Sequence, residues 1–98
     1  MHVVHILGQG VEFDPNKDAD NIAKHGVSLT EGDGVLGDPL CLTVEDVSSE
    51  GERRWVSIGT NVFGILYVVV WTKRDLNERI ISVRKPEPRE RKVYEAKR

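Results

Sequence analysis

The chain of 98 residues is long enough for one domain with a single modest core. Hydrophobic residues make up 39% and charged residues 31%, a balance that is typical of a folded globular protein and excludes global disorder. The longest apolar run, residues 65–71, has the length of a buried strand and excludes a transmembrane helix there. We therefore expect residues 1–98 to form a single domain with no membrane partner.

The first residues and the cysteine content bear on cellular location. The chain opens without the basic start and the long apolar stretch of a secretory signal. Its one cysteine, Cys41, cannot form an internal disulfide, which agrees with a reducing compartment. We expect a cytoplasmic protein.

Charge is distributed unevenly along the chain. The net charge is only −2, but residues 73–98 carry ten Lys/Arg against five Asp/Glu, and the first half is strongly acidic. A basic segment of this kind can contact phosphate groups. It is equally typical of a solvated surface with salt bridges along a helix. Charge alone leaves both interpretations open.

The first clear element is a helix over residues 15–25. Asp14 is a good N-cap, and Pro15 suits the first helical turn, where its missing N–H is not needed. Gly26 stands where a left-handed residue commonly ends a helix, directly after Lys24 and His25, which favour the negative helix end.

A second, weaker helix is predicted to begin at residues 28–31, which have capping-box spacing. Gly32 and Gly34 oppose it, because each costs about 1 kcal/mol relative to alanine. We expect this helix to be short and to end near Gly37.

The middle of the chain alternates with period two, which predicts strands separated by short polar turns. They are expected at residues 40–45, 53–58, 65–72 and 79–85. Pro86 and Pro88 stop the last strand, and Pro88 can open a final helix that ends near residue 97. Residues 3–13 are a candidate for one more strand at the sheet edge.

These elements predict an α+β fold. Two N-terminal helices precede an antiparallel meander of four strands, or five with residues 3–13, and a short C-terminal helix follows. Helices are expected to cover one face of the sheet and to leave the other face available for a ligand or partner.

Arginines and aromatic residues alternate along the predicted strands. Alternation places Arg53, Trp55, Tyr67, Trp71 and Arg84 on or near one face. Guanidinium groups pair with phosphate and aromatic rings stack on unpaired bases, so this face is a candidate RNA surface. The alternative is that the tryptophans are ordinary core residues and the arginines frame the sheet. The pattern leaves both open.

Other chemical signals are weak. His2 and His5 lack the cysteine or carboxylate partners of a metal site, so we expect no metal and no cofactor. His25 is either a residue that favours the helix end or a catalytic base. The sequence shows no Ser/His/Asp arrangement and no pair of carboxylates in an apolar setting.

Several short stretches together resemble the BrnT toxin family. They follow the family's order at residues 13–17, 21–27, 37–39, 52–54, 72–74, 79–85 and 90–95. The more specific are Lys-His-Gly-Val at 24–27 and Arg-Ile-Ile-Ser-Val-Arg-Lys at 79–85. Phe13 stands where the family usually has Trp, and the two glycines of the second helix replace a stretch usually rich in Glu, Ala and Phe.

The resemblance implies a RelE-like fold and a ribonuclease toxin of a type II toxin–antitoxin system. It also implies neutralisation by a BrnA-like antitoxin of the ribbon-helix-helix type, and therefore a hetero-oligomer. Contact with DNA would then occur only through the antitoxin.

The hypothesis that follows is an endoribonuclease that needs no metal, in which the RNA 2′-OH attacks the adjacent phosphate. Arg79 and Arg84, together with Arg53, are the candidates for stabilising charge on that phosphate. Glu52 or His25 is the candidate general base or acid. The candidate RNA-binding residues are Lys73, Arg74, Lys85, Trp55 and Tyr67. The rival hypothesis is a non-catalytic module whose open sheet face and C-terminal helix bind the antitoxin.

Overall fold

The computed structural model of the chain describes residues 5–7, 10–48 and 50–96, and for residues 5–7 it describes the backbone alone. Within these ranges the chain forms six strands and three helices. They follow in the order β1 (His5–Leu7), β2 (Val11–Phe13), α1 (Pro15–His25), α2 (Glu31–Leu36), β3 (Leu42–Asp46), β4 (Arg54–Thr60), β5 (Leu66–Arg74), β6 (Asn77–Arg84) and α3 (Pro88–Ala96). The predicted order of two helices, a meander and a final helix is confirmed, and a strand pair precedes it.

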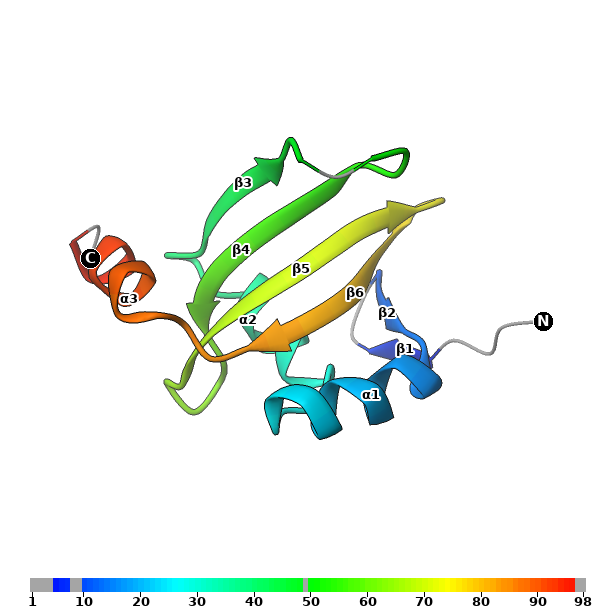
Figure 1. Cartoon of the computed structure of the whole chain (residues 1–98), viewed down its shortest axis with the longest axis horizontal. Coiled ribbons are helices and arrows are strands. Elements are labelled where there is room, and N and C mark those ends of the chain that lie inside the picture. The colour runs from blue at the N-terminus through cyan, green and yellow to red at the C-terminus, as the bar shows by residue number, and fades with distance from the viewer. Residues whose placement is uncertain (1–4, 8–9, 49, 97–98) are drawn as a thin grey trace.

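The strands that the structure describes form one mixed sheet in the order β1-β2-β6-β5-β4-β3 (Figure 1). The meander from β3 to β6 is antiparallel, as predicted. The expectation of four or five strands, all antiparallel, is wrong, because β2 pairs with β6 in parallel and β1 lies outside it. A parallel pair needs a long connection, and residues 14–76 separate these two strands.

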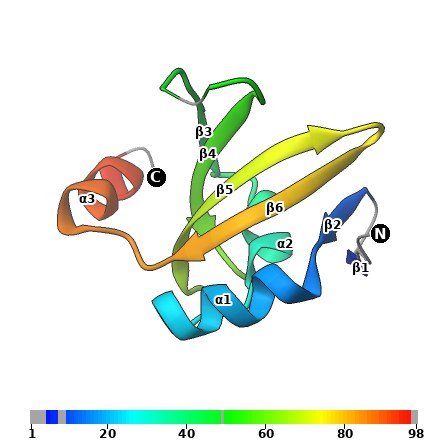
Figure 2. The same ribbon diagram turned by 45° about the vertical axis from the view of Figure 1, so that its right-hand side comes forward.

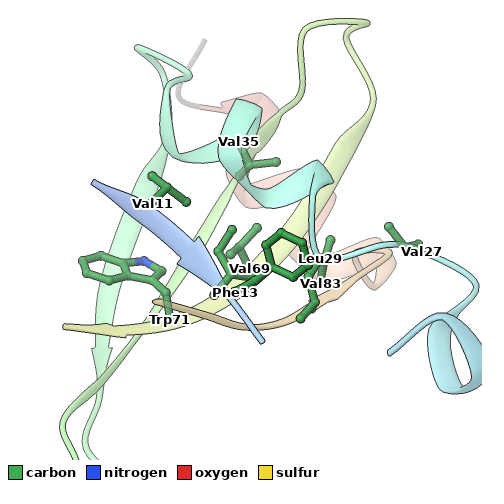
Figure 3. Close-up of a cluster of buried hydrophobic side chains, with 9 residues drawn as sticks. Val11, Phe13, Val27, Leu29, Val35, Val69, Trp71 and Val83 are labelled. Atoms are coloured by element: carbon green, nitrogen blue, oxygen red, sulfur yellow. The ribbon is translucent and has the colours of Figure 1, made fainter. Parts of the chain in front are cut away.

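The helices lie on both sides of this sheet. Figure 2 shows α2 and α3 on opposite sides of the strands, and α1 runs along the same side as α2. The core lies between the sheet and these first two helices, where Val69 and Val83 meet Leu29 and Val35 (Figure 3). Much of the opposite face is not covered by a helix, and α3 stands at its β3–β4 side (Figure 1).

Helix α1 has the predicted caps and one unexpected anchor. Asp14 accepts a hydrogen bond from the Asn16 backbone N–H at 2.9 Å, and Gly26 is left-handed with φ 73°. The buried Asn21 side chain donates to the Val83 carbonyl at 2.8 Å and accepts from the Val83 N–H at 3.2 Å. Since β2 pairs with β6 only at its other end, this amide takes the place of a neighbouring strand.

A bulge in β6 changes which side chains share a face. Val70 pairs with Ser82, but Trp71 pairs with Ile80, so Ile81 is an extra residue. Alternation therefore restarts at the bulge, and residues on its two sides exchange faces relative to a regular strand. As a result Ile80 and Val83 both point into the core.

Helix α2 is short, as predicted, but its glycines have a packing role. A Cβ on Gly32 would lie 2.8 Å from the Ile80 side chain and 3.3 Å from Val69 and Val83. The missing side chain therefore lets the helix backbone approach the sheet. The same feature that lowers helix propensity creates the tight contact between α2 and the core.

Gly32→Ala tests this close approach. Helix propensity alone predicts that alanine stabilises the protein by about 1 kcal/mol. We expect the opposite, a loss of about 1–3 kcal/mol in the free energy of unfolding, because the added methyl overpacks the core. Urea unfolding measures it. Gly37→Ala is the matched control, because an added Cβ there meets only ordinary contacts of 3.6 Å or more, and an equal effect of the two changes would contradict the packing role.

Helix α3 is held by two polar contacts at its ends. The Tyr94 hydroxyl donates to the Asp38 carboxylate at 2.5 Å, and the same carboxylate accepts from the Thr60 N–H at 2.9 Å. Arg84 binds Glu90 through two hydrogen bonds of 2.8 Å. The second pair is charge-assisted, and the Arg84 hydrogen bonds lower the pKa of Glu90 against the opposing effect of burial.

The Asp38 contact predicts a pH dependence. Burial by itself raises the pKa of Asp38, but hydrogen bonds from Tyr94 and from nearby groups outweigh it and hold the pKa below its ordinary value. A lowered pKa in the folded state gives stability that is present above the unfolded pKa and lost as the pH falls through the folded pKa.

Tyr94→Phe should therefore reduce the free energy of unfolding by about 1–3 kcal/mol at neutral pH. The difference from the unmodified protein should shrink as the pH falls and Asp38 becomes protonated. Urea unfolding at a series of pH values measures both. Tyr67→Phe is the control, because its hydroxyl makes no hydrogen bond with any residue that the structure describes. A Tyr94→Phe difference that does not vary with pH would contradict the role of Asp38.

Candidate functional site

The open face of the sheet carries a hollow of about 360 Å³ near the ends of β4, β5 and β6. We call it the basic hollow. Four cationic side chains and two carboxylates line it together with three other residues, namely Lys17, Arg54, Arg74, Arg79, Asp14, Glu52, Thr72, Ile80 and Ile81. Such an excess of positive charge in a concave surface suits a phosphate-bearing ligand.

Strand register brings these cations together. Thr72 pairs with Arg79 on the neighbouring strand, so both side chains lie on the same face. Arg54 lies on β4 at a position of the same parity, two residues before Val56, which pairs with Val70. Lys17 reaches the hollow from the first turn of α1, and Asp14, the N-cap of that helix, lies beside it.

Glu52 and Arg74 form an ion pair within the basic hollow. The Arg74 Nε donates to Glu52 Oε1 at 2.7 Å, and both side chains are partly exposed. The pair holds a carboxylate among the cations of the hollow. It therefore supplies a proton acceptor beside groups that attract phosphate.

Arg79 forms an ion pair with a buried carboxylate. Its Nε and Nη2 donate to Glu12 Oε2 at 3.1 and 2.8 Å, and the Glu12 side chain is only 5% exposed. A buried carboxylate is stable as an anion only when it is paired. Arg79 is therefore both a wall of the hollow and the partner that keeps β2 on β6.

The aromatic residues proposed for an RNA surface lie on the covered side of the sheet. Trp55, Tyr67 and Trp71 do share a face, but it is the face that α2 covers, where Trp71 is buried and the other two pack against the core. Trp55 and Trp71 stack at 5.0 Å between ring centroids. The interpretation of these rings as core residues is the one that the structure supports.

Arg53 lies on the same covered side as these rings. Its guanidinium stands 5.1 Å from the Trp55 ring centroid and makes two hydrogen bonds of 2.9 Å to Glu45. It does not line the basic hollow. Neighbouring residues of a strand point to opposite faces, so Arg54 reaches the hollow instead.

Arg79 and Arg84, the two arginines of β6 proposed for the same phosphate, do not line one hollow. The bulge places both on the open face, but the β5 partner of Arg84 is Val68, four residues and about 13 Å from the partner of Arg79. Arg84 is bound to Glu90 of α3 and is absent from the lining of the basic hollow.

The remaining predicted residues are divided between the hollow and other surfaces. Glu52 and Arg74 line the basic hollow, whereas the exposed Lys73 lies at a separate depression beside Trp71. His25 ends α1, eight residues and about 12 Å along the helix from Lys17. The exposed Lys85 follows the end of β6 and does not line the hollow.

Sequence reasoning missed Lys17 and Arg54. Lys17 stands three residues after the N-cap Asp14, on the first helical turn, and from sequence this stretch indicated the start of the helix and the family resemblance. Arg54 was not proposed, because its neighbour Arg53 was assigned to the site instead. The signal that finds Arg54 is its parity with Thr72, which needs the strand register and not only the composition.

A second depression lies beside α3 on the same face. We call it the apolar groove, and its lining is Leu42, Val44, Val56, Ile58, Val68, Glu90 and Val93. It has a volume of about 200 Å³. Six of its seven lining residues are aliphatic, so its chemistry differs from that of the basic hollow.

The structure also bears on metal binding and on membrane insertion. Among the residues that the structure describes, no group of three or more His, Cys, Asp or Glu side chains is placed to hold a metal ion. No helix in the same part of the chain has the length and apolar character needed to span a bilayer.

Comparison with known proteins gives the class and then the family. The model of a family described as the ribonuclease toxin, BrnT, of type II toxin–antitoxin systems matches residues 13–90. This match covers well over half of the chain and includes every residue that lines the basic hollow. It defines the class as ribonuclease toxins of type II systems. The chain belongs to the BrnT family.

A solved structure has a similar fold. The crystal structure of the Brucella abortus ribonuclease toxin BrnT superimposes with a TM-score of 0.54 and 22% sequence identity. The similarity covers 76% of this chain and 92% of that one. A search of curated proteins gives no significant match.

Arg79→Ala tests the structural role of the Glu12 pair. We expect a loss of about 3 kcal/mol in the free energy of unfolding, because a buried carboxylate is left without a partner. The double variant Glu12→Leu/Arg79→Met should recover most of that loss, since it leaves no unpaired charge. Chemical denaturation measures both, and a single variant as stable as the unmodified protein would contradict this role.

Proposed function

We propose that this protein is an endoribonuclease that cleaves RNA without a metal ion, through attack of the 2′-OH on the adjacent 3′-phosphate. One observation carries the proposal, namely the convergence of Lys17, Arg54, Arg74 and Arg79 on one hollow of an open sheet face. Membership of a ribonuclease toxin family supports the same conclusion.

The reaction needs alignment and positive charge more than it needs a nucleophile from the protein. A bond forms between O2′ and phosphorus while the bond from phosphorus to O5′ breaks. The products are a 2′,3′-cyclic phosphate and a free 5′-OH. The proton of the 2′-OH passes to a base, and O5′ receives a proton as it leaves. Cations placed around the crowded phosphorus stabilise the charge that grows on its oxygens.

Lys17 and Arg54 are the principal cations in this proposal. Neither forms an ion pair with any residue that the structure describes, so their charge is available to the phosphate. Arg74 and Arg79 each have a carboxylate partner that holds the guanidinium in position. In this proposal they line the hollow and donate hydrogen bonds to the phosphate. Glu52 is the proposed general base, held in place by Arg74.

The proposed partner is a BrnA-like antitoxin of the ribbon-helix-helix type. A type II system pairs its toxin with an antitoxin protein, and the family match supports such a pairing here. The toxin would form a hetero-oligomer with the antitoxin in the cytoplasm and would meet DNA only through it. A RelE-like fold is part of the same proposal.

Arg54→Ala should lower the rate of RNA cleavage about 100-fold or more, because it removes a cation from the site of charge development. Arg84→Ala is the matched control, and it should keep most of the cleavage rate although it loosens α3. The measurement uses purified protein and a labelled oligoribonucleotide in EDTA, with detection of the cyclic phosphate.

The outcomes separate three hypotheses. Loss of cleavage in Arg84→Ala with normal cleavage in Arg54→Ala would contradict the assignment to the basic hollow. Cleavage that stops in EDTA would contradict the metal-independent reaction. No cleavage by the unmodified protein, with tight antitoxin binding, would favour a non-catalytic interaction module.

A further inference from the structure

The basic hollow and the apolar groove lie side by side on one sheet face. Val56 of the groove and Arg54 of the hollow are two residues apart on β4, which is about 7 Å. On β5, Val68 lines the groove and Thr72 lines the hollow. One short peptide segment lying across β4 and β5 can therefore reach both depressions.

The groove suits aliphatic side chains. Its walls are valine, leucine and isoleucine, and its single polar residue, Glu90, is already bound to Arg84 through two hydrogen bonds. Val44 and Val93 remain 65% and 53% exposed within it, although both are apolar. Apolar surface left open in a concave site is typical of a place where another protein binds.

The same chemistry argues against a nucleotide in this groove. Unpaired bases are bound by stacking on aromatic rings or guanidinium planes and by hydrogen bonds to their edges. No aromatic ring lines the groove among the described residues, and the Arg84 guanidinium beside it is bound to the groove residue Glu90. A protein segment is therefore the favoured occupant.

We propose that the two depressions together form the binding surface for the antitoxin. Aliphatic side chains of one antitoxin segment fill the apolar groove, and acidic side chains of the same segment lie over Lys17 and Arg54. This inference rests on the proposed function, because it makes the antitoxin occupy the place of the RNA phosphate. Charge complementarity speeds the encounter, and burial of the aliphatic side chains keeps the complex together.

Two groove variants test the inference. Val44→Asp and Val93→Asp place a charge in the groove at partly exposed positions, where the fold should tolerate it, and thermal unfolding checks that it does. The dissociation constant for the purified cognate antitoxin should rise about tenfold or more, since a carboxylate must lose its water to enter an apolar contact. RNA cleavage by the free toxin should change less than about twofold, because neither residue lines the basic hollow.

Val47→Asp is the matched control. Val47 is 91% exposed on the turn after β3 and lines neither depression, so its antitoxin affinity should equal that of the unmodified protein. A second arm uses a 2′-deoxy oligonucleotide that cannot be cleaved. It should compete with the antitoxin, because both need the basic hollow.

The combination of antitoxin affinity and RNA cleavage shows which proposal is contradicted. Unchanged antitoxin affinity in both groove variants, with normal cleavage, would overturn the docking surface and leave the nuclease proposal intact. Lower RNA cleavage with unchanged antitoxin affinity would instead make the groove an RNA subsite and overturn the inference. Weakened antitoxin binding in a protein that never cleaves RNA would support the docking surface and end the nuclease proposal.

Discussion

The buried ion pair between Glu12 and Arg79 is the interaction on which the rest of the structure depends. It joins β2, near the start of the chain, to β6, near its end, and so closes the sheet on the side opposite β3. The same arginine forms part of the wall of the basic hollow. Because a buried carboxylate without a cationic partner destabilises the folded state, both the fold and the basic hollow require Arg79. A substitution of Arg79 therefore changes the stability of the protein as well as the rate of catalysis. Substitution of Arg54 tests catalysis more directly.

The predictions from sequence succeeded where the signal is local. Asp14 and Gly26 gave the ends of α1, and period-two alternation gave the four strands of the meander, because caps and alternation act within a few residues. The predictions from sequence failed for contacts between segments that are far apart along the chain. The parallel pairing of β2 with β6, and the amide of Asn21 that replaces a strand beside Val83, have no local signature. The two glycines of α2 were interpreted as helix breakers, although at Gly32 the structure shows a need for close approach to the sheet.

The candidate site was predicted in part for the same reason. Of the residues proposed for the site from sequence, Arg74, Arg79 and Glu52 line the basic hollow. Alternation through β6 assigned Arg84 to the wrong face, because it cannot reveal an extra residue in a strand. Lys17 enters from a helix that precedes the sheet, and only the folded chain brings it to Arg54. The aromatic residues that suggested base stacking are used by the core instead.

The bulge at Ile81 also bears on how this protein can change during evolution. With this extra residue in place, Arg79 faces the open side of the sheet and the next residue, Ile80, faces the core. A regular strand that loses one residue exchanges the faces of the residues beyond the deletion. In β6 the loss of Ile81 would instead restore regular pairing, because Ile80 and Ser82 already lie opposite neighbouring residues of β5. The lineage can therefore shorten this strand by one residue and keep both the core contact of Ile80 and the place of Arg79 in the wall of the hollow.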